Sequence, residues 1–322
     1  MYMRGVAVAL IRAAVIGAGN MGRHHVRILE RFEDVELVGV VDPGIDPATS
    51  SLPIDAARHF SSVDELPEID FAVIATPTQM HADLACTLIE RGANLLIEKP
   101  LAETPADATR IVEAAEKAGV LLAVGHVERF NPAVRMLAQM ATDPRLVQFE
   151  RLSPYTPRIR DSVVFDLMVH DLDLACWICG GTPVRVQASG AKVFSESVDV
   201  AAAVLEFANG RIASLETSRA TQDKVRRIAV SEPDRYLVAD SIRQDLSMRR
   251  QTTVEFEKTE PPIYRQASVV EIPYVDRSGE PLAAELRDVI DAIRTSGTPT
   301  VTGRDGLRAV ELAFAVEAAI RG

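Results

Sequence analysis

The sequence predicts an α/β fold in which a doubly wound parallel sheet is followed by a domain with an open, mainly antiparallel sheet and helices. Its first part alternates short β-branched runs with helical segments, the pattern of a parallel sheet covered by helices. Beyond residue 131 strand-like runs follow one another directly, and Asn209-Gly210 between two of them is typical of a type I′ hairpin turn. A length of 322 residues fits two domains. We place them at residues 13–130 and 131–322, after an N-terminal extension at residues 1–12.

The expected strands of the first domain are apolar throughout, as strands are when helices cover both faces of their sheet. They span residues 13–17, 35–42, 71–75, 94–98 and 121–125. Helical periodicity marks the segments at residues 22–31, 80–91 and 105–118. In the second domain we expect strands at residues 184–194, 200–207, 211–219, 225–230, 236–239 and 253–257, and helices at 165–179, 281–295 and 305–320.

The amino-acid composition is that of an ordinary globular protein with an excess of acidic residues. Hydrophobic residues make up 47% and charged residues 25%, which excludes intrinsic disorder. Against 35 Lys and Arg stand 46 Asp and Glu, so the net charge is -11. This charge opposes attraction to phosphate backbones and anionic lipid surfaces, and we expect neither a nucleic acid nor a membrane as partner.

The cysteines and the N-terminus bear on the cellular compartment. Three cysteines are too few for a disulfide framework, which favours a reducing cytoplasm. Cys176 and Cys179 form a CxxC spacing without further zinc ligands nearby, so we expect core packing and no metal. Residues 1–12 resemble a weak signal peptide, but their apolar run is short and no cleavage site follows. We interpret them as an extension, either native or from an upstream start site.

A glycine motif, Gly17-Ala18-Gly19-Asn20-Met21-Gly22, stands between the first expected strand and a helix. In such a motif Gly17 permits a tight turn, Gly19 lets the backbone approach a pyrophosphate, and Gly22 lets the helix pack closely on the strand. Asn20 and Met21 open the helix that faces the anion. The motif predicts a dinucleotide site; a glycine turn without a ligand is the alternative.

Asp42 ends the next apolar run, where a carboxylate is suited to bind both hydroxyls of the adenosine ribose. A 2′-phosphate would place about two negative charges roughly 4 Å from this carboxylate, a repulsion on the order of kilocalories. Pro43 and Gly44 follow, and neither is a cation that would offset the repulsion. The sequence therefore favours NAD over NADP, with a turn residue before Pro43 as the alternative for Asp42.

Two further segments follow strands and are expected at the same sheet edge. Ala75, Thr76 and Pro77 come after the third strand, and we expect Thr76 and Pro77 beside the nicotinamide ribose. Ala75 and His81, which begins the following helix, are also expected beside the cofactor, and for His81 a structural role is a better interpretation than catalysis. Glu98-Lys99-Pro100 ends another strand.

These motifs, in this order and spacing, resemble the Gfo/Idh/MocA family of nicotinamide-dependent sugar oxidoreductases. The resemblance extends from Ala13 to near Ile320 and implies a Rossmann domain, a substrate domain and a homodimer or homotetramer. It also implies that Glu98 and Lys99 meet the cofactor and that Lys99 reaches the substrate. There the ammonium would bind the reacting hydroxyl and stabilise a developing alkoxide. An exposed lysine at a strand end is the alternative.

The family's second signature is matched by Asp166 and His170 on the helix expected at residues 165–179. Positions i and i+4 share one helix face. The resemblance implies that His170, with an ordinary pKa near 6.5, accepts the hydroxyl proton while Asp166 orients the sugar. A buried structural histidine and a solvated aspartate are the alternatives. Many members carry glycines before this helix, whereas this chain has Asp161-Ser-Val-Val-Phe165. The resemblance therefore does not determine the shape of this loop or which sugar binds there.

The segment at residues 125–132 adds a resemblance to UDP-N-acetylglucosamine 3-dehydrogenases, which oxidise the sugar 3-hydroxyl. It implies that Glu128, Arg129 and Asn131 bind substrate, while Asn131-Pro132 also reads as a helix start. Arg158 and Arg160 would bind a diphosphate, or are ordinary surface residues. A dehydrogenase of a free cyclitol or monosaccharide and a non-catalytic NAD-binding sensor are the alternative functions.

Overall fold

The computed structural model describes residues 9–45, 55–157, 161–257 and 263–322. The chain forms two compact units: residues 1–126 with 282–310, and residues 127–281 with 311–322. This division differs from the contiguous boundary predicted from the sequence, because residues 282–310 return to the first unit. Arg158 and Arg160 lie outside the described residues.

A six-stranded parallel sheet forms the centre of the first unit, in the order β3-β2-β1-β4-β5-β6. Its strands are β1 (Ile11–Ile16), β2 (Val35–Val41), β3 (His59–Phe60), β4 (Phe71–Ile74), β5 (Asn94–Glu98) and β6 (Leu122–Gly125). The predicted parallel sheet is confirmed, although β3 was not predicted. Because β1 begins at Ile11, residues 11 and 12 belong to the sheet and not to an extension. The strand order reverses between β1 and β4, which is where ligands bind in doubly wound sheets.

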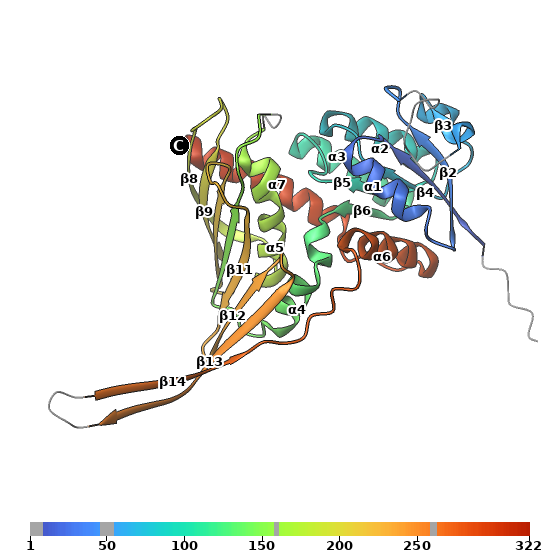
Figure 1. Ribbon diagram of the computed structural model, residues 1–322. Helices are drawn as coiled ribbons and strands as arrows, with labels where there is room; N and C mark the ends of the chain where they lie inside the picture. The colour runs from blue at the N-terminus through green and yellow to red at the C-terminus, as the bar shows by residue number, and fades with distance from the viewer. Residues whose placement is uncertain (1–8, 46–54, 158–160, 258–262) are drawn as a thin grey trace, which may run out of the picture. The chain divides into compact units, whose positions relative to one another are not determined.

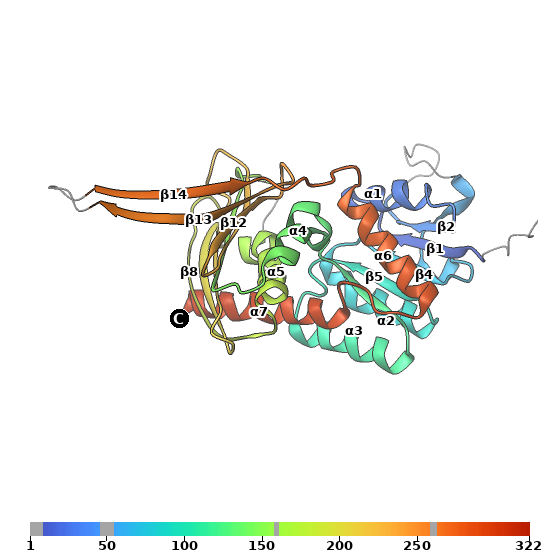
Figure 2. The same cartoon turned by 90° about the horizontal axis from the view of Figure 1, so that it is seen from below.

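Helices cover both faces of this sheet, with α1 and α6 on one face and α2 and α3 on the other (Figure 2). They are α1 (Asn20–Leu29), α2 (His81–Glu90), α3 (Pro105–Ala118) and α6 (Pro281–Thr295), joined by the short 3₁₀ turns η1 (Ala56–Arg58), η2 (Val63–Glu65) and η3 (Thr78–Met80). Helix α3 begins at the Thr104 cap, followed by Pro105, and ends at Gly119 with a left-handed φ of 70°.

Helix α6 explains why the chain returns to the first unit. Its apolar residues Leu286, Val289 and Ile290 are buried in one cluster with strand residues such as Val15. Arg287 pairs with Asp34, with an Nη1–Oδ2 distance of 2.7 Å. An amphipathic helix buries its apolar stripe wherever a sheet face is open, and the sequence does not show which sheet that is.

The second unit contains an eight-stranded mixed sheet in the order β14-β13-β12-β11-β7-β10-β9-β8 (Figure 1). Its strands are β7 (Leu146–Leu152), β8 (Pro183–Ala191), β9 (Val200–Phe207), β10 (Ile212–Ser218), β11 (Val225–Ser231), β12 (Arg235–Asp240), β13 (Asp245–Glu257) and β14 (Ile263–Glu271). The mainly antiparallel sheet is confirmed, but β7 and β10 pair in parallel. Strands β7 and β14 were not predicted.

The turn between β9 and β10 differs from the predicted type I′ turn. Gly210 has a φ of 79°, but Asn209 is not among the residues with positive φ, as a type I′ turn requires. The amide of Gly210 donates to the carbonyl of Phe207 at 2.9 Å. The loop is therefore a turn over Ala208 and Asn209 followed by a left-handed glycine, the arrangement of a three-residue hairpin loop.

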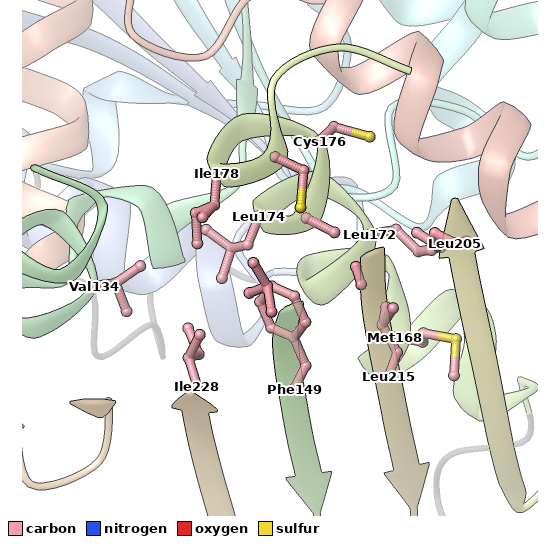
Figure 3. Packing of buried hydrophobic residues seen from close by; sticks show 14 of the residues in the cluster. Val134, Phe149, Met168, Leu172, Leu174, Cys176, Ile178, Leu205, Leu215 and Ile228 are labelled. Carbon is pink, nitrogen blue, oxygen red and sulfur yellow. The ribbon is translucent and has the colours of Figure 1, made fainter. Parts of the chain in front are cut away.

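Helices pack against the second sheet on one side. They are the 3₁₀ turn η4 (Val127–Phe130), α4 (Pro132–Met140), the π-helical turn η5 (Val164–Met168), α5 (Val169–Cys179) and α7 (Gly303–Arg321), which supplies residues to both units. Met168, Leu172 and Cys176 lie over Phe149 and other strand residues (Figure 3). Core packing of Cys176 and Cys179 is confirmed, and burial raises the pKa of Cys179 to about 12. No helix of the described segments is long and apolar enough to cross a membrane.

Candidate active site

The glycine turn after β1 has the geometry that the motif predicts. Gly17 has a φ of 91°, and a Cβ there would lie 2.6 Å from the carbonyl oxygen of Ala75. At Gly22 a Cβ would lie 1.9 Å from the Gly17 oxygen, so the start of α1 packs directly on the turn. A Cβ at Gly19 would meet nothing within 4 Å. Two of the glycines are thus required by packing, whereas the third faces open space.

The N-terminus of α1 is suited to an anion. Gly19 precedes the helix without a side-chain cap, and its first turn, which includes Asn20 and Met21, carries no acidic residue. The first amide groups of a helix lack partners inside it and carry a partial positive charge. Together with the space at Gly19, this end of α1 fits a pyrophosphate.

Asp42 follows β2 and is held against the glycine turn. Its Oδ2 accepts a hydrogen bond from the Ala18 amide at 2.8 Å, and its Oδ1 accepts one from the Gly44 amide at 2.9 Å. The bond from Gly44 closes a local turn, as expected for the alternative role of Asp42 as a turn residue. Each carboxylate oxygen has further acceptor capacity, and the role of Asp42 toward a ribose stays a prediction.

His81 joins two loops at the carboxyl edge of the sheet. Its Nε2 lies 3.0 Å from the Thr76 oxygen and its Nδ1 lies 3.1 Å from the Pro100 oxygen. The ring is buried, and burial lowers its pKa, so it is neutral and has one N–H to donate at a time. This geometry supports the structural interpretation of His81. Contacts of His81, Ala75, Thr76 and Pro77 with the cofactor stay predictions.

Lys99 follows β5 at the same edge and is half-buried, whereas Glu98 before it points inward. The Oε1 atom of Glu98 lies 2.8 Å from Nε2 of His25 on α1. Burial raises the pKa of Glu98, but the hydrogen bond to His25 and the charges of His25 and Lys99 outweigh this effect and lower it. Gly125 leaves room for the carboxylate, since a Cβ there would lie 3.0 Å from its Oε2. Glu98 is therefore an ionised buried group next to Lys99, and its contact with the cofactor stays a prediction.

Sequence reasoning missed two residues of this region, His25 and Glu285. The spacing of His25, three residues after Gly22 on the buried face of α1, was the available signal. Glu285 on α6 is 1% exposed, and neither carboxylate oxygen has a hydrogen-bond partner among the described residues. Burial, with the charges of Glu98 and Asp288, raises its pKa well above the ordinary value. Burial therefore favours the protonated form of the Glu285 carboxyl.

In the second unit, Asp166 and His170 lie at the start of the helix that the sequence predicted at residues 165–179. Asp166 is inside the π turn η5, and His170 is the second residue of α5. Both are half-exposed, while Met168 and Val169 between them are buried. They therefore share the accessible side of this segment. π-helical turns are rare in proteins, but those that occur are often found at functional sites. The hydrophobic periodicity of the sequence did not predict this one.

Three other predicted substrate residues, Glu128, Arg129 and Asn131, have partners inside this unit. Arg129 pairs with Asp173, and Glu128 pairs with Arg151, which also binds Asp171. Asn131 caps α4 by accepting from the Ala133 amide at 3.1 Å, as its helix-start interpretation requires. Contacts of Glu128, Arg129, Asn131, Arg158 and Arg160 with a substrate stay predictions.

A family of known oxidoreductases has this pair of domains. The model of the oxidoreductase family with an NAD-binding Rossmann fold, GFO/IDH/MocA, matches residues 11–126, and the model of the GFO/IDH/MocA C-terminal domain matches residues 135–232. The chain belongs to this family and is an NAD-binding oxidoreductase. The glycine turn and the anion-binding end of α1 described above fit that cofactor.

Individual members of the family are similar to this chain over nearly its whole length. The UDP-N-acetylglucosamine 3-dehydrogenase of Acidithiobacillus ferrooxidans is 33% identical over 96% of this chain and 97% of its own. A solved structure of that enzyme has a TM-score of 0.83 at 31% identity and covers 97% of this chain and 98% of its own. An inositol 2-dehydrogenase of Rhizobium meliloti is 28% identical over 97% of this chain and 96% of its own.

Proposed function

We propose that this protein is an NAD-dependent dehydrogenase that oxidises a hydroxyl carbon of a nucleotide sugar, of the class of the 3-hydroxyl of UDP-N-acetylglucosamine. The observation that carries the proposal is the presence of Lys99 after β5 and of Asp166 with His170 on one accessible side of a helix start. The similarity to the Acidithiobacillus enzyme supports the substrate class.

The chemistry assigns one role to each side chain. The glycine turn and the N-terminus of α1 would hold NAD+, which would supply the acceptor for the hydride of the oxidised carbon. We assign to His170 the acceptance of the hydroxyl proton as the carbonyl forms. Lys99 donates a hydrogen bond to the reacting oxygen and stabilises its developing negative charge. Asp166 orients the sugar by accepting from a neighbouring hydroxyl.

A free cyclitol is the second candidate substrate, because the inositol 2-dehydrogenase of Rhizobium meliloti is similar over nearly the whole chain. The test is an absorbance assay at 340 nm with NAD+ and, in turn, UDP-N-acetylglucosamine, myo-inositol and glucose. We expect turnover with the nucleotide sugar at a kcat/KM at least tenfold above the other two. Preference for myo-inositol would replace the proposed substrate, and no NADH formation with any of them would favour a non-catalytic NAD-binding sensor.

The assigned residues are tested by Lys99→Met and His170→Gln. Both variants should lose more than a thousandfold in kcat while the dissociation constant for NAD, measured by fluorescence quenching, changes less than threefold. Full turnover of either variant at saturating sugar would contradict the assigned chemistry.

We also propose that the protein acts in the cytoplasm as a homodimer or homotetramer. The three cysteines are free, and NAD is an intracellular cofactor. Light scattering of the purified protein would measure the mass of the assembly, and a monomer at micromolar concentration would contradict this proposal.

A further inference from the structure

Two arginines hold the helix that carries His170. Arg151 on β7 reaches Asp171 with two bonds, from Nε to Oδ2 at 2.8 Å and from Nη2 to Oδ1 at 2.7 Å. Its remaining nitrogen, Nη1, binds Glu128 at 2.9 Å. Arg151 is 5% exposed and Asp171 is 2% exposed. Burial lowers the pKa of Arg151, but the two carboxylates outweigh it, so the guanidinium stays charged.

The second arginine, Arg129, binds the same helix from a different element, η4. Arg129 on η4 binds Asp173 through Nε at 2.7 Å and through Nη2, and its guanidinium lies 5.5 Å from the ring centroid of Trp177. Arg129 is 3% exposed and Asp173 is 2% exposed. Both pairs are thus planar, two-bond contacts inside the second unit, a geometry that lysine cannot form.

The two pairs act on opposite sides of α5. Successive residues of an α-helix are about 100° apart around its axis, so Asp171 and Asp173 point in nearly opposite directions. Rotation of the helix about its axis in either sense would break one of the two-bond contacts. His170 immediately precedes Asp171, so the same contacts fix the backbone position from which its imidazole projects.

Stability alone does not explain these pairs. A buried ion pair costs about as much in desolvation as its attraction returns, and apolar replacements are often neutral. Packing of α5 is already supplied by core residues such as Leu172 and Cys176. The start of α5 has no side-chain cap and follows a π turn, so its orientation is not fixed by the usual local signals.

We propose that Arg129 and Arg151 are positioning residues that fix the rotation of α5 and thereby the direction of the His170 side chain. The inference rests on the proposed function, in which His170 accepts the substrate proton. It assigns to Arg129 and to the Glu128–Arg151 pair a role inside the protein, in place of direct contact with the sugar.

The test uses Arg129→Lys and Arg151→Lys, which keep the charge and remove the two-bond geometry. We expect kcat to fall at least tenfold in each, with the NAD dissociation constant within twofold of wild type. The imidazole ¹⁵N resonances of His170, assigned with His170→Gln, should shift and broaden. Arg145→Lys is the matched control, because the Arg145–Asp143 pair of the same unit is exposed; neither readout should change there.

A double variant that removes both charges of one pair distinguishes an effect on the orientation of α5 from an effect on folding. In Arg129→Met/Asp173→Leu both charges are removed together, so the fold should persist while kcat stays at least tenfold reduced. Wild-type kcat in this double variant, or in both lysine variants, would overturn the positioning role. If His170→Gln itself kept wild-type kcat, the proposed function would fail, and the two failures are thereby distinguished.

Discussion

The Nε2 atom of His25 lies 2.8 Å from the Oε1 atom of Glu98, and both side chains are buried. Glu98 is the last residue of β5, and Lys99 follows it. A carboxylate that is buried and ionised needs such a partner, because an isolated charge in an apolar interior is costly. The pair joins α1, which begins at the glycine turn, to the strand end that carries Lys99. The glycine turn and Lys99 are therefore linked through a buried contact between α1 and β5.

Replacing His25 by leucine should destabilise the protein strongly. The Glu98 carboxylate would lose its hydrogen bond, and removal of one partner of a buried pair costs about 3–5 kcal/mol. Urea denaturation at neutral pH measures the free energy of unfolding. The control is His24→Leu on the exposed side of the same helix, with a change below about 0.5 kcal/mol. Equal effects of the two substitutions would show that the pair does not stabilise the fold.

Replacing Glu285 by glutamine should stabilise the protein, increasingly so as the pH rises. The raised pKa of Glu285 contributes stability that is complete below its unfolded pKa and is lost as the pH rises toward the folded pKa. Wild type and variant should match near the unfolded pKa and then separate as the pH rises, by at most about 1.4 kcal/mol for each pH unit until the folded pKa is reached. Urea midpoints from pH 5 to pH 8 test this.

The matched control for Glu285 is Asp291→Asn on the same helix, because the side chain of Asp291 is 61% exposed. It should show no gain that grows with pH. A constant difference between Glu285→Gln and wild type over this range would mean that the fold does not raise the pKa of Glu285.

Replacing Asp42 by asparagine should relax the preference for NAD. The amide oxygen can keep a hydrogen bond from a backbone amide, but the negative charge that repels a 2′-phosphate is gone. We expect the ratio of kcat/KM for NADP to that for NAD to rise at least tenfold, measured with saturating sugar. An unchanged ratio would show that the charge of Asp42 does not select the dinucleotide.

Alanine substitutions in the glycine turn should separate binding from folding. Gly19→Ala adds a methyl group to open space, so the melting temperature should stay within about 2 °C while the dissociation constant for NAD rises at least tenfold. Gly22→Ala forces a Cβ against the Gly17 oxygen and should lower the melting temperature by about 8 °C or more. Calorimetry with and without NAD measures both, and similar melting temperatures for the two variants would contradict this assignment.

Much of the first unit was predictable because its signals are local. Continuous apolar runs mark buried parallel strands, and the glycine spacing is determined by contacts a few residues apart. In the second unit β7 was missed because Glu150 and Arg151 interrupt its apolar pattern, and Arg151 is buried only because Asp171 and Glu128 neutralise it. Such a pairing spans 20 residues or more and leaves no periodic trace.

The sequence by itself determined the parallel sheet, the glycine turn, Lys99 after β5 and the position of Asp166 and His170 at the start of a helix, since each follows from residue type and spacing. Only the tertiary structure decided that α6 returns to the first sheet and that His25 pairs with Glu98. It also decided that the charge of Glu98 acts on the buried Glu285, and that Arg129 and Arg151 bind α5 on opposite sides. The physical reason is that burial and charge pairing depend on which distant segments meet. Residues far apart in the chain acquire their partners and their protonation states only when the fold forms.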